Sequence, residues 1–146
     1  MKYLVLMLSI LLFANAAIAQ KGKGASSPGS NAVLATIVAR ISQNGNYESP
    51  YVGFAGSYSE QYKNYDNLLA SATDQDLLLL VKDESPAVRI YAFKALLAKN
   101  LELAASIFKD LKSDKTDIFT LEGCIGGQAT VSSLATRFMK NAGASE

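Results

Sequence analysis

Tyrosine, a single cysteine and the absence of histidine define the chemistry that this sequence offers. Five tyrosines lie between residues 47 and 65, and the chain contains no histidine and one cysteine, Cys124. Without histidine the chain lacks the commonest general base, the serine–histidine and cysteine–histidine arrangements of nucleophilic enzymes, and most zinc sites. We therefore predict a protein that is not an enzyme, has no catalytic residues, and uses neither a cofactor nor a metal.

Cys124 has no second cysteine with which to form an intrachain disulfide. In an oxidising compartment a lone thiol is buried, pairs between chains, or is reactive. Because free cysteine usually behaves as a small apolar residue, we expect Cys124 to be buried.

Three of the tyrosines follow a helical spacing. Tyr58, Tyr62 and Tyr65 are four and three residues apart, and Leu69 follows after another four. Residues at this spacing lie on one face of a helix, so we expect this group to pack against a neighbouring helix.

Three other aromatic residues, Tyr47, Tyr51 and Phe54, lie outside that spacing. They belong to residues 47–56, where Pro50 and two glycines predict an irregular connection. Tyrosine offers a flat apolar face and a polar tip, which suits the binding of a peptide or a sugar. The segment therefore either folds back on the helices or presents Tyr47, Tyr51 and Phe54 as a binding patch.

The first residues have the composition of a secretory signal peptide. An apolar run at residues 4–13 follows a basic start, and Ala17 and Ala19 form a small-residue cleavage site. We predict a signal peptide at residues 1–19, a mature N-terminus at Gln20, and export to the periplasm or out of the cell. The apolar run is too short to span a bilayer, so we expect no membrane anchor after cleavage.

The charge balance argues against two classes of partner. The chain has 14 basic and 13 acidic residues, and loss of the signal peptide removes Lys2 and no acid, which makes the totals equal. A neutral mature chain lacks the basic surface needed for nucleic acid or an anionic membrane. Residues 20–30, rich in glycine, serine and lysine, are predicted to be a flexible tail before a single domain at residues 31–142.

Apolar residues recur every three or four positions in several segments, which predicts helices. The segments are residues 31–43, 73–81, 86–99, 101–112 and 130–141. The sequence does not decide the secondary structure of residues 117–128. Their glycines favour turns, while Ile118, Phe119 and Leu121 fit a short extended stretch.

The two helices at residues 73–99 are the best defined. Thr73 and Asp76 form a capping box at the first helix, with Asp in the position where Glu or Gln is usual. Ser85 is a natural N-cap for the second helix, and Pro86 suits its first position.

This helix pair resembles a HEAT-type helical repeat. The residues that carry the resemblance are Leu77, Leu80, Asp83, Pro86, Val88, Arg89, Ala92, Ala95 and Leu96. The resemblance implies an all-α fold, a short stack of antiparallel helix pairs forming an α-solenoid fragment. It also implies a turn held by Asp83, Pro86 and Arg89.

From these observations we expect an exported, non-catalytic helical-repeat module that binds a protein or peptide partner. The alternative is a glycan-binding or enzyme-accessory protein that uses an aromatic surface patch formed by Tyr47, Tyr51 and Phe54.

Overall fold

The structure is a computed structural model that describes residues 28–143, with side chains from residue 31 onward. The predicted signal peptide at residues 1–19 lies outside the described residues, as do residues 20–27 of the predicted tail. The first helix, α1, begins at Pro28, three residues before the predicted start of the domain.

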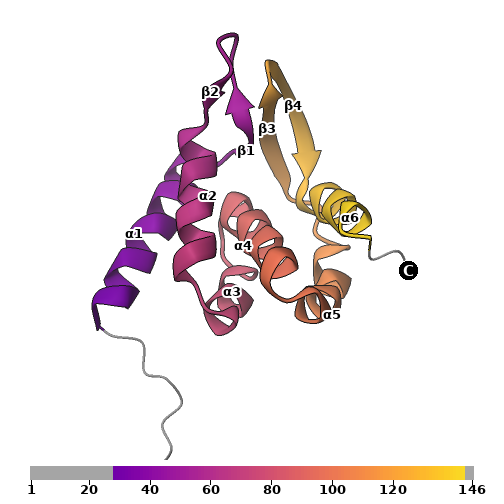
Figure 1. Ribbon diagram of the computed structural model, residues 1–146. Helices are drawn as coiled ribbons and strands as arrows, with labels where there is room; N and C mark the ends of the chain where they lie inside the picture. The colour runs from indigo at the N-terminus through magenta and orange to yellow at the C-terminus, as the bar shows by residue number, and fades with distance from the viewer. Residues whose placement is uncertain (1–27, 144–146) are drawn as a thin grey trace, which may run out of the picture.

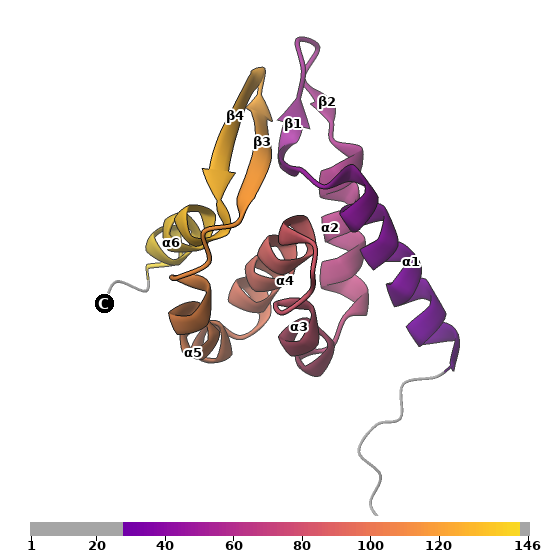
Figure 2. The same ribbon diagram turned by 180° about the vertical axis from the view of Figure 1, so that it is seen from behind.

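The described residues form six helices and four strands (Figure 1). In chain order they are α1 (Pro28–Asn44), β1 (Tyr47–Val52), β2 (Ser57–Tyr58), α2 (Glu60–Ser71), α3 (Asp74–Leu80), α4 (Pro86–Lys99), α5 (Leu101–Leu111), β3 (Asp117–Gly123), β4 (Ile125–Thr130) and α6 (Val131–Asn141). The helices surround α4, and two β-hairpins rise side by side at one end of them, as the view from behind in Figure 2 also shows.

The all-α prediction is wrong, and so is the α-solenoid. The strands form one four-stranded mixed sheet in the order β2-β1-β3-β4. Each hairpin is antiparallel, whereas β1 and β3 pair in parallel, with Tyr47 opposite Thr120. The chain is therefore an α/β protein in which segments far apart in sequence meet in the sheet.

The segment predicted as an irregular connection contains β1, a tight turn and β2. Pro50 lacks an N–H, and it falls where the pairing of β1 with β3 shifts register, between Glu48 and Val52. Gly53 and Gly56 have positive φ angles of 75° and 61° and close the turn through an N–H···O bond of 3.0 Å. Proline and glycine therefore shape the hairpin here instead of preventing it.

Helix α4 forms the centre of the core. Its buried residues lie all around the helix and not on one stripe, as expected of a helix surrounded by other elements. They are Ala87, Val88, Ile90, Tyr91, Ala92, Phe93, Ala95 and Leu96. In Figure 1, α4 lies between α2 and α6.

The caps of the central helix pair agree with the sequence in part. The capping box of Thr73 and Asp76 at α3 is confirmed. Pro86 occupies the first turn of α4, but the Ser85 hydroxyl makes no capping bond. Instead the Ser85 N–H donates to a carboxylate oxygen of Asp83 at 2.8 Å, which stabilises the turn itself.

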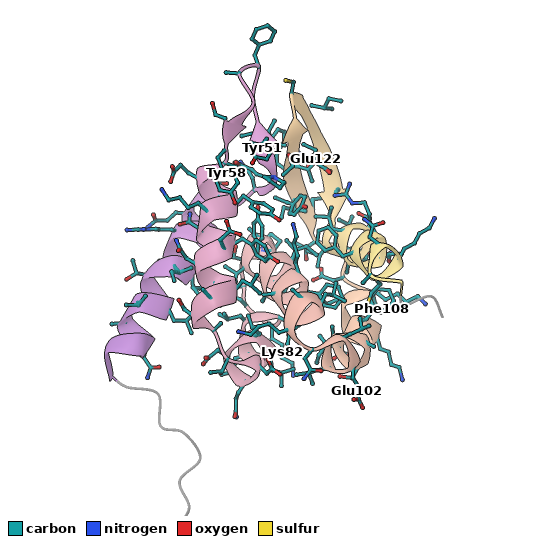
Figure 3. All side chains as sticks on the ribbon, viewed as in Figure 1. Tyr51, Tyr58, Lys82, Glu102, Phe108 and Glu122 are labelled. Carbon is teal, nitrogen blue, oxygen red and sulfur yellow. The ribbon has the colours of Figure 1, made fainter. Side chains whose placement is uncertain are left out.

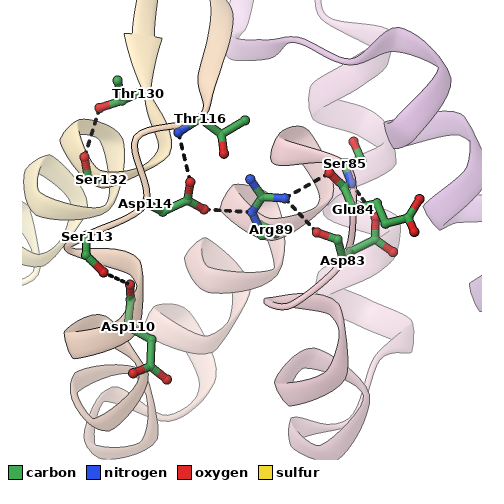
Figure 4. A network of polar contacts seen from close by, with 10 residues as sticks. All are labelled: Asp83, Glu84, Ser85, Arg89, Asp110, Ser113, Asp114, Thr116, Thr130 and Ser132. Atoms are coloured by element: carbon green, nitrogen blue, oxygen red, sulfur yellow. Dashed lines mark hydrogen bonds and ion pairs between the residues drawn. The ribbon is translucent and has the colours of Figure 1, made fainter.

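Arg89 holds this turn through backbone carbonyls and not through the Asp83 side chain (Figure 4). Its Nη1 donates to the backbone carbonyls of Asp83 and Glu84 at 2.7 and 2.9 Å. Its Nε forms an ion pair at 2.9 Å with Asp114, in the connection between α5 and β3. Arg89 thus joins the turn before α4 to a segment 25 residues further along the chain.

Candidate functional site

The three aromatic residues predicted as a binding patch lie in two different environments. Tyr47 is buried, with 5% of its surface exposed, and faces the helices. Tyr51 in β1 and Phe54 in the following turn are exposed, with exposed fractions of 62% and 103% (Figure 3 labels Tyr51). Each of the two alternatives from the sequence therefore describes part of the segment. It folds back on the helices at Tyr47, and it exposes the side chains of Tyr51 and Phe54.

The turn of the second hairpin lies beside that of the first. The Gly53 N–H donates to the Gly123 carbonyl at 3.0 Å, and the Cys124 thiol donates to the Gly53 carbonyl at 3.2 Å. The expected burial of Cys124 is wrong, because the thiol is exposed at the tip of a hairpin. Ile125 follows it with 76% of its surface exposed. We call Tyr51, Phe54 and Ile125 the hairpin-tip patch.

From the base of this patch a continuous series of aromatic rings runs into the protein. Neighbouring ring centroids are separated by 5.1 to 6.0 Å, a range in which aromatic pairs attract one another. In order the rings are those of Tyr51, Tyr58, Tyr62, Tyr65, Tyr91, Tyr47 and Phe138. They come from β1, β2, α2, α4 and α6, so only the folded chain brings them together.

Tyr91 fixes the position of Tyr47 in this series. The Glu48 N–H donates to the Tyr91 hydroxyl at 2.8 Å, and that hydroxyl donates to the Glu48 carbonyl at 3.2 Å. These buried bonds hold β1 against α4 next to Tyr47. The Tyr47 ring consequently lies between Tyr91 and Phe138.

Lys94, one turn after Tyr91 on α4, places its ammonium group among these rings. The distances from Nζ to the ring centroids are 4.4 Å for Tyr62, 4.9 Å for Tyr65, 5.3 Å for Tyr47 and 5.5 Å for Phe138. All four lie within the range of a cation–π interaction. These four rings of the aromatic series form a cage around one cation.

The hydrogen bonds of Lys94 use two of the three N–H donors of its ammonium group. Nζ lies 3.3 Å from the hydroxyl oxygens of both Tyr47 and Tyr62. An ammonium group has three N–H donors, and these two contacts account for two of them. Within residues 31–143 no carboxylate forms an ion pair with Lys94.

Burial lowers the pKa of Lys94 to about 8, because the half-buried ammonium is poorly hydrated. The Asp66 carboxylate opposes this shift, Arg137 adds to it through repulsion, and Glu122 opposes it weakly. Asp66 itself accepts a hydrogen bond from the Tyr58 hydroxyl, and that bond raises the pKa of Tyr58 to about 12. The acid that most favours the charged form of Lys94 thus has another partner.

The phenols around Lys94 stay neutral at physiological pH. Burial raises the pKa of Tyr47 to about 12 and also raises the pKa of Tyr62 and Tyr65 above the ordinary value. Their hydroxyls are therefore hydrogen-bond donors and acceptors and do not compensate the charge of Lys94.

Lys94 opens into a cleft of about 380 Å³ between α2, α4 and α6. The residues that line it are Tyr47, Tyr65, Lys94, Leu97, Ala98, Phe138, Asn141 and Ala142. A mostly apolar lining with a few polar groups is typical of a ligand site, and the volume lies in the range of small-molecule pockets. We refer to this site as the Lys94 cleft.

Arg137 adds a second cation beside the cleft. Its guanidinium lies 5.8 Å from the ring centroids of both Tyr47 and Phe138 and forms a 2.8 Å ion pair with Glu122 of β3. Both side chains of this pair are about 40% exposed. Arg137 therefore has a carboxylate partner. Lys94, which lines the cleft, has none among the described residues.

Sequence reasoning missed Lys94. A lone lysine on a helix normally lies at the surface, and its apolar neighbours are explained by helix packing. The available signal was the sequence around it, because Lys94 interrupts the run Ala92-Phe93-Lys94-Ala95-Leu96, in which the other four residues are buried. The cage could not be found in this way, because its rings come from segments at residues 47, 62–65 and 138.

No known protein family model matches this chain, and no curated protein sequence matches it. Within residues 28–143 no helix is long and apolar enough to cross a bilayer. The same part of the chain has no group of three or more acidic or cysteine side chains placed to hold a metal ion.

Proposed function

We propose that this chain is a non-catalytic binding module that holds a protein or peptide partner by a carboxylate group in the Lys94 cleft. The observation that supports this most is the environment of Lys94: a cation on aromatic rings, open to a cleft, with no carboxylate partner among the described residues. A buried charge without a partner is costly, and an anionic ligand would supply the missing partner.

The lining of the cleft favours a carboxylate next to an apolar group. Leu97, Ala98 and Phe138 provide apolar surface, while the third N–H of Lys94 is available to a ligand oxygen. The C-terminus of a peptide that ends in leucine or phenylalanine combines these two features. A charge-assisted hydrogen bond of this kind contributes about 1.5–3 kcal/mol.

The test compares two forms of one ligand. N-acetyl-Ala-Leu and N-acetyl-Ala-Phe, each with a free carboxylate or a C-terminal amide, are titrated into the protein by isothermal calorimetry. We expect the free acid to bind at least ten-fold more tightly than the amide, and Lys94→Met to abolish that difference. Lys140→Met removes an exposed cation from α6 and serves as the matched control. Equal binding of acid and amide, or unchanged binding by Lys94→Met, would contradict the proposal.

A second candidate uses the hairpin-tip patch. It is favoured by the complete exposure of Phe54 at the end of a hairpin, beside Tyr51 and Ile125. No residue from 51 to 58 or from 123 to 130 is charged, so the tips carry apolar and polar groups alone. A glycan or a partner enzyme that contacts these side chains would make the protein an accessory module. In both candidates the protein is exported, as its first residues predict.

A further inference from the structure

Lys94 combines three properties that a nucleophilic amine needs, and the carboxylate-binding proposal uses only its charged form. Its Nζ faces a cleft with room for a small molecule. The surrounding rings keep the amine in a largely apolar environment. Two neutral phenols lie within hydrogen-bond distance of Nζ. An amine in such surroundings reacts with carbonyl groups.

We infer that Lys94 is a reactive amine that condenses with small, mainly apolar aldehydes or ketones in the Lys94 cleft to form an imine. This covalent capture goes beyond reversible carboxylate binding, which it does not require. It uses the neutral amine, while carboxylate binding uses the ammonium form of the same residue.

The neutral form is accessible at physiological pH. With a pKa of about 8, about one Lys94 in ten is neutral at pH 7, against about one in three thousand for a lysine at the ordinary value of 10.5. The groups that face this amine are Tyr47 from β1, Tyr62, Tyr65 and Asp66 from α2, Phe138 and Arg137 from α6, and Glu122 from β3. Among these groups Asp66 and Glu122 favour the charged form, and burial outweighs them.

The reaction balances with groups already present in the cleft. The Nζ lone pair attacks the carbonyl carbon, and a proton moves from nitrogen to oxygen to give a carbinolamine. The phenol of Tyr47 or Tyr62, each 3.3 Å from Nζ, donates a proton to the departing hydroxyl, which leaves as water. The resulting iminium then returns its N–H proton to the phenolate, and the products are an imine and one water molecule.

The same rings favour the cationic intermediate. An iminium at the position of Nζ lies over Tyr62 and Tyr65, as the ammonium does, and gains the same cation–π attraction. Leu97, Ala98 and Phe138 then contact the carbon chain of the carbonyl compound. The lining therefore selects a small aliphatic or aromatic carbonyl compound over a polyhydroxylated one.

The experiment traps the imine by reduction. The protein is incubated with hexanal, samples are quenched with sodium borohydride at intervals, and each lysine is quantified by peptide mass spectrometry. At low conversion we expect Lys94 to be alkylated at least ten-fold faster than the exposed Lys140. The rate at Lys94 should reach half of its maximum near pH 8.

Two variants test the role of the cleft. Lys94→Arg keeps the charge and removes the nucleophile, so it should lose the fast labelling. Tyr62→Phe keeps the ring and removes one proton donor, and should slow labelling of Lys94 several-fold without altering that of Lys140. Labelling of Lys94 no faster than Lys140 in the folded wild-type protein would overturn this inference. That result would not contradict the proposal of carboxylate binding, because carboxylate binding is measured separately with the acetylated dipeptides.

Discussion

Lys94 carries a charge that its surroundings only partly compensate. The rings of the cage attract the ammonium, but burial disfavours its charged form and lowers its pKa to about 8. An unfolded chain holds the same proton with an ordinary pKa near 10.5. The folded state therefore binds this proton less tightly, and the linked free energy destabilises the fold at neutral pH.

Replacing Lys94 by methionine should stabilise the protein at pH 7. The gain should be on the order of 1–3 kcal/mol, because an apolar chain of similar length fills the cage without a desolvation penalty. The penalty is fully present below about pH 8 and disappears as pH rises toward the unfolded value of 10.5, so the gain should shrink over this interval.

Urea unfolding of wild type and Lys94→Met, followed by circular dichroism between pH 7 and 10, measures this difference. Comparing the two proteins at each pH removes the contribution of the tyrosines, which both share. A gain that stays constant with pH would contradict the lowered pKa of Lys94. Lys140→Met, at an exposed position of α6, is the control.

At the scale of elements, Arg89 and Asp114 hold the start of α4 to the connection between α5 and β3. The two side chains are only 13% and 18% exposed. Burial raises the pKa of the Asp114 carboxyl, but hydrogen bonds from Thr116 and the Arg89 guanidinium outweigh it and lower that pKa below its ordinary value. The stability that Asp114 contributes is therefore present at neutral pH and is lost as pH falls through its folded pKa.

A double-mutant cycle with Arg89→Met and Asp114→Asn should give a coupling energy on the order of 1–3 kcal/mol at pH 7. The more exposed pair of Arg137 and Glu122 provides the control and should give less than about 1 kcal/mol. Asp83→Ala should be nearly additive with Arg89→Met, because Arg89 bonds to the backbone of Asp83 and not to its carboxylate. Strong coupling of Asp83 to Arg89, with none to Asp114, would contradict this arrangement.

Elements with a local signal could be predicted from the sequence, and those without one could not. The capping box of Thr73 and Asp76 is formed by neighbouring residues, and it is present. Strands β1 and β3 are supported by pairing between residues about 70 positions apart, such as Tyr47 and Thr120. Pro50 and the glycines of β4 weaken any local strand pattern. The all-α prediction therefore applied the helical resemblance of residues 73–99 to segments that form strands.

At the scale of the whole molecule, two surfaces could bind partners. The hairpin-tip patch lies at the free ends of the hairpins, and the Lys94 cleft lies between α2, α4 and α6 at the inner end of the aromatic series. Tyr51 and Phe54 of the predicted patch are found at the tips, whereas Tyr47 lines the cleft. Sequence reasoning grouped them because they are neighbours in the chain, and the fold separates them.

The double variant Tyr51→Ser and Phe54→Ser should separate the two surfaces. Both side chains are exposed, so we expect the melting temperature to change by no more than a few degrees. Binding of acetylated dipeptides in the Lys94 cleft should be unchanged, and only capture of a tip-binding partner should fall. Leu79→Ser, at a 71% exposed apolar residue on α3, is the control. A large loss of stability would instead make the tip residues part of the packing.

The pKa of Lys94 itself is the most direct test of the proposed site. In protein labelled with ¹³C-lysine, the Cε resonances are followed by NMR from pH 6 to 11, and the signal missing in Lys94→Met identifies this residue. We predict a midpoint of about 8 in the free protein, and a higher midpoint when N-acetyl-Ala-Leu is bound, because its carboxylate favours the ammonium form. A midpoint near 10.5, together with no change on addition of the dipeptide, would contradict both the desolvation of Lys94 and its proposed binding of an anionic ligand.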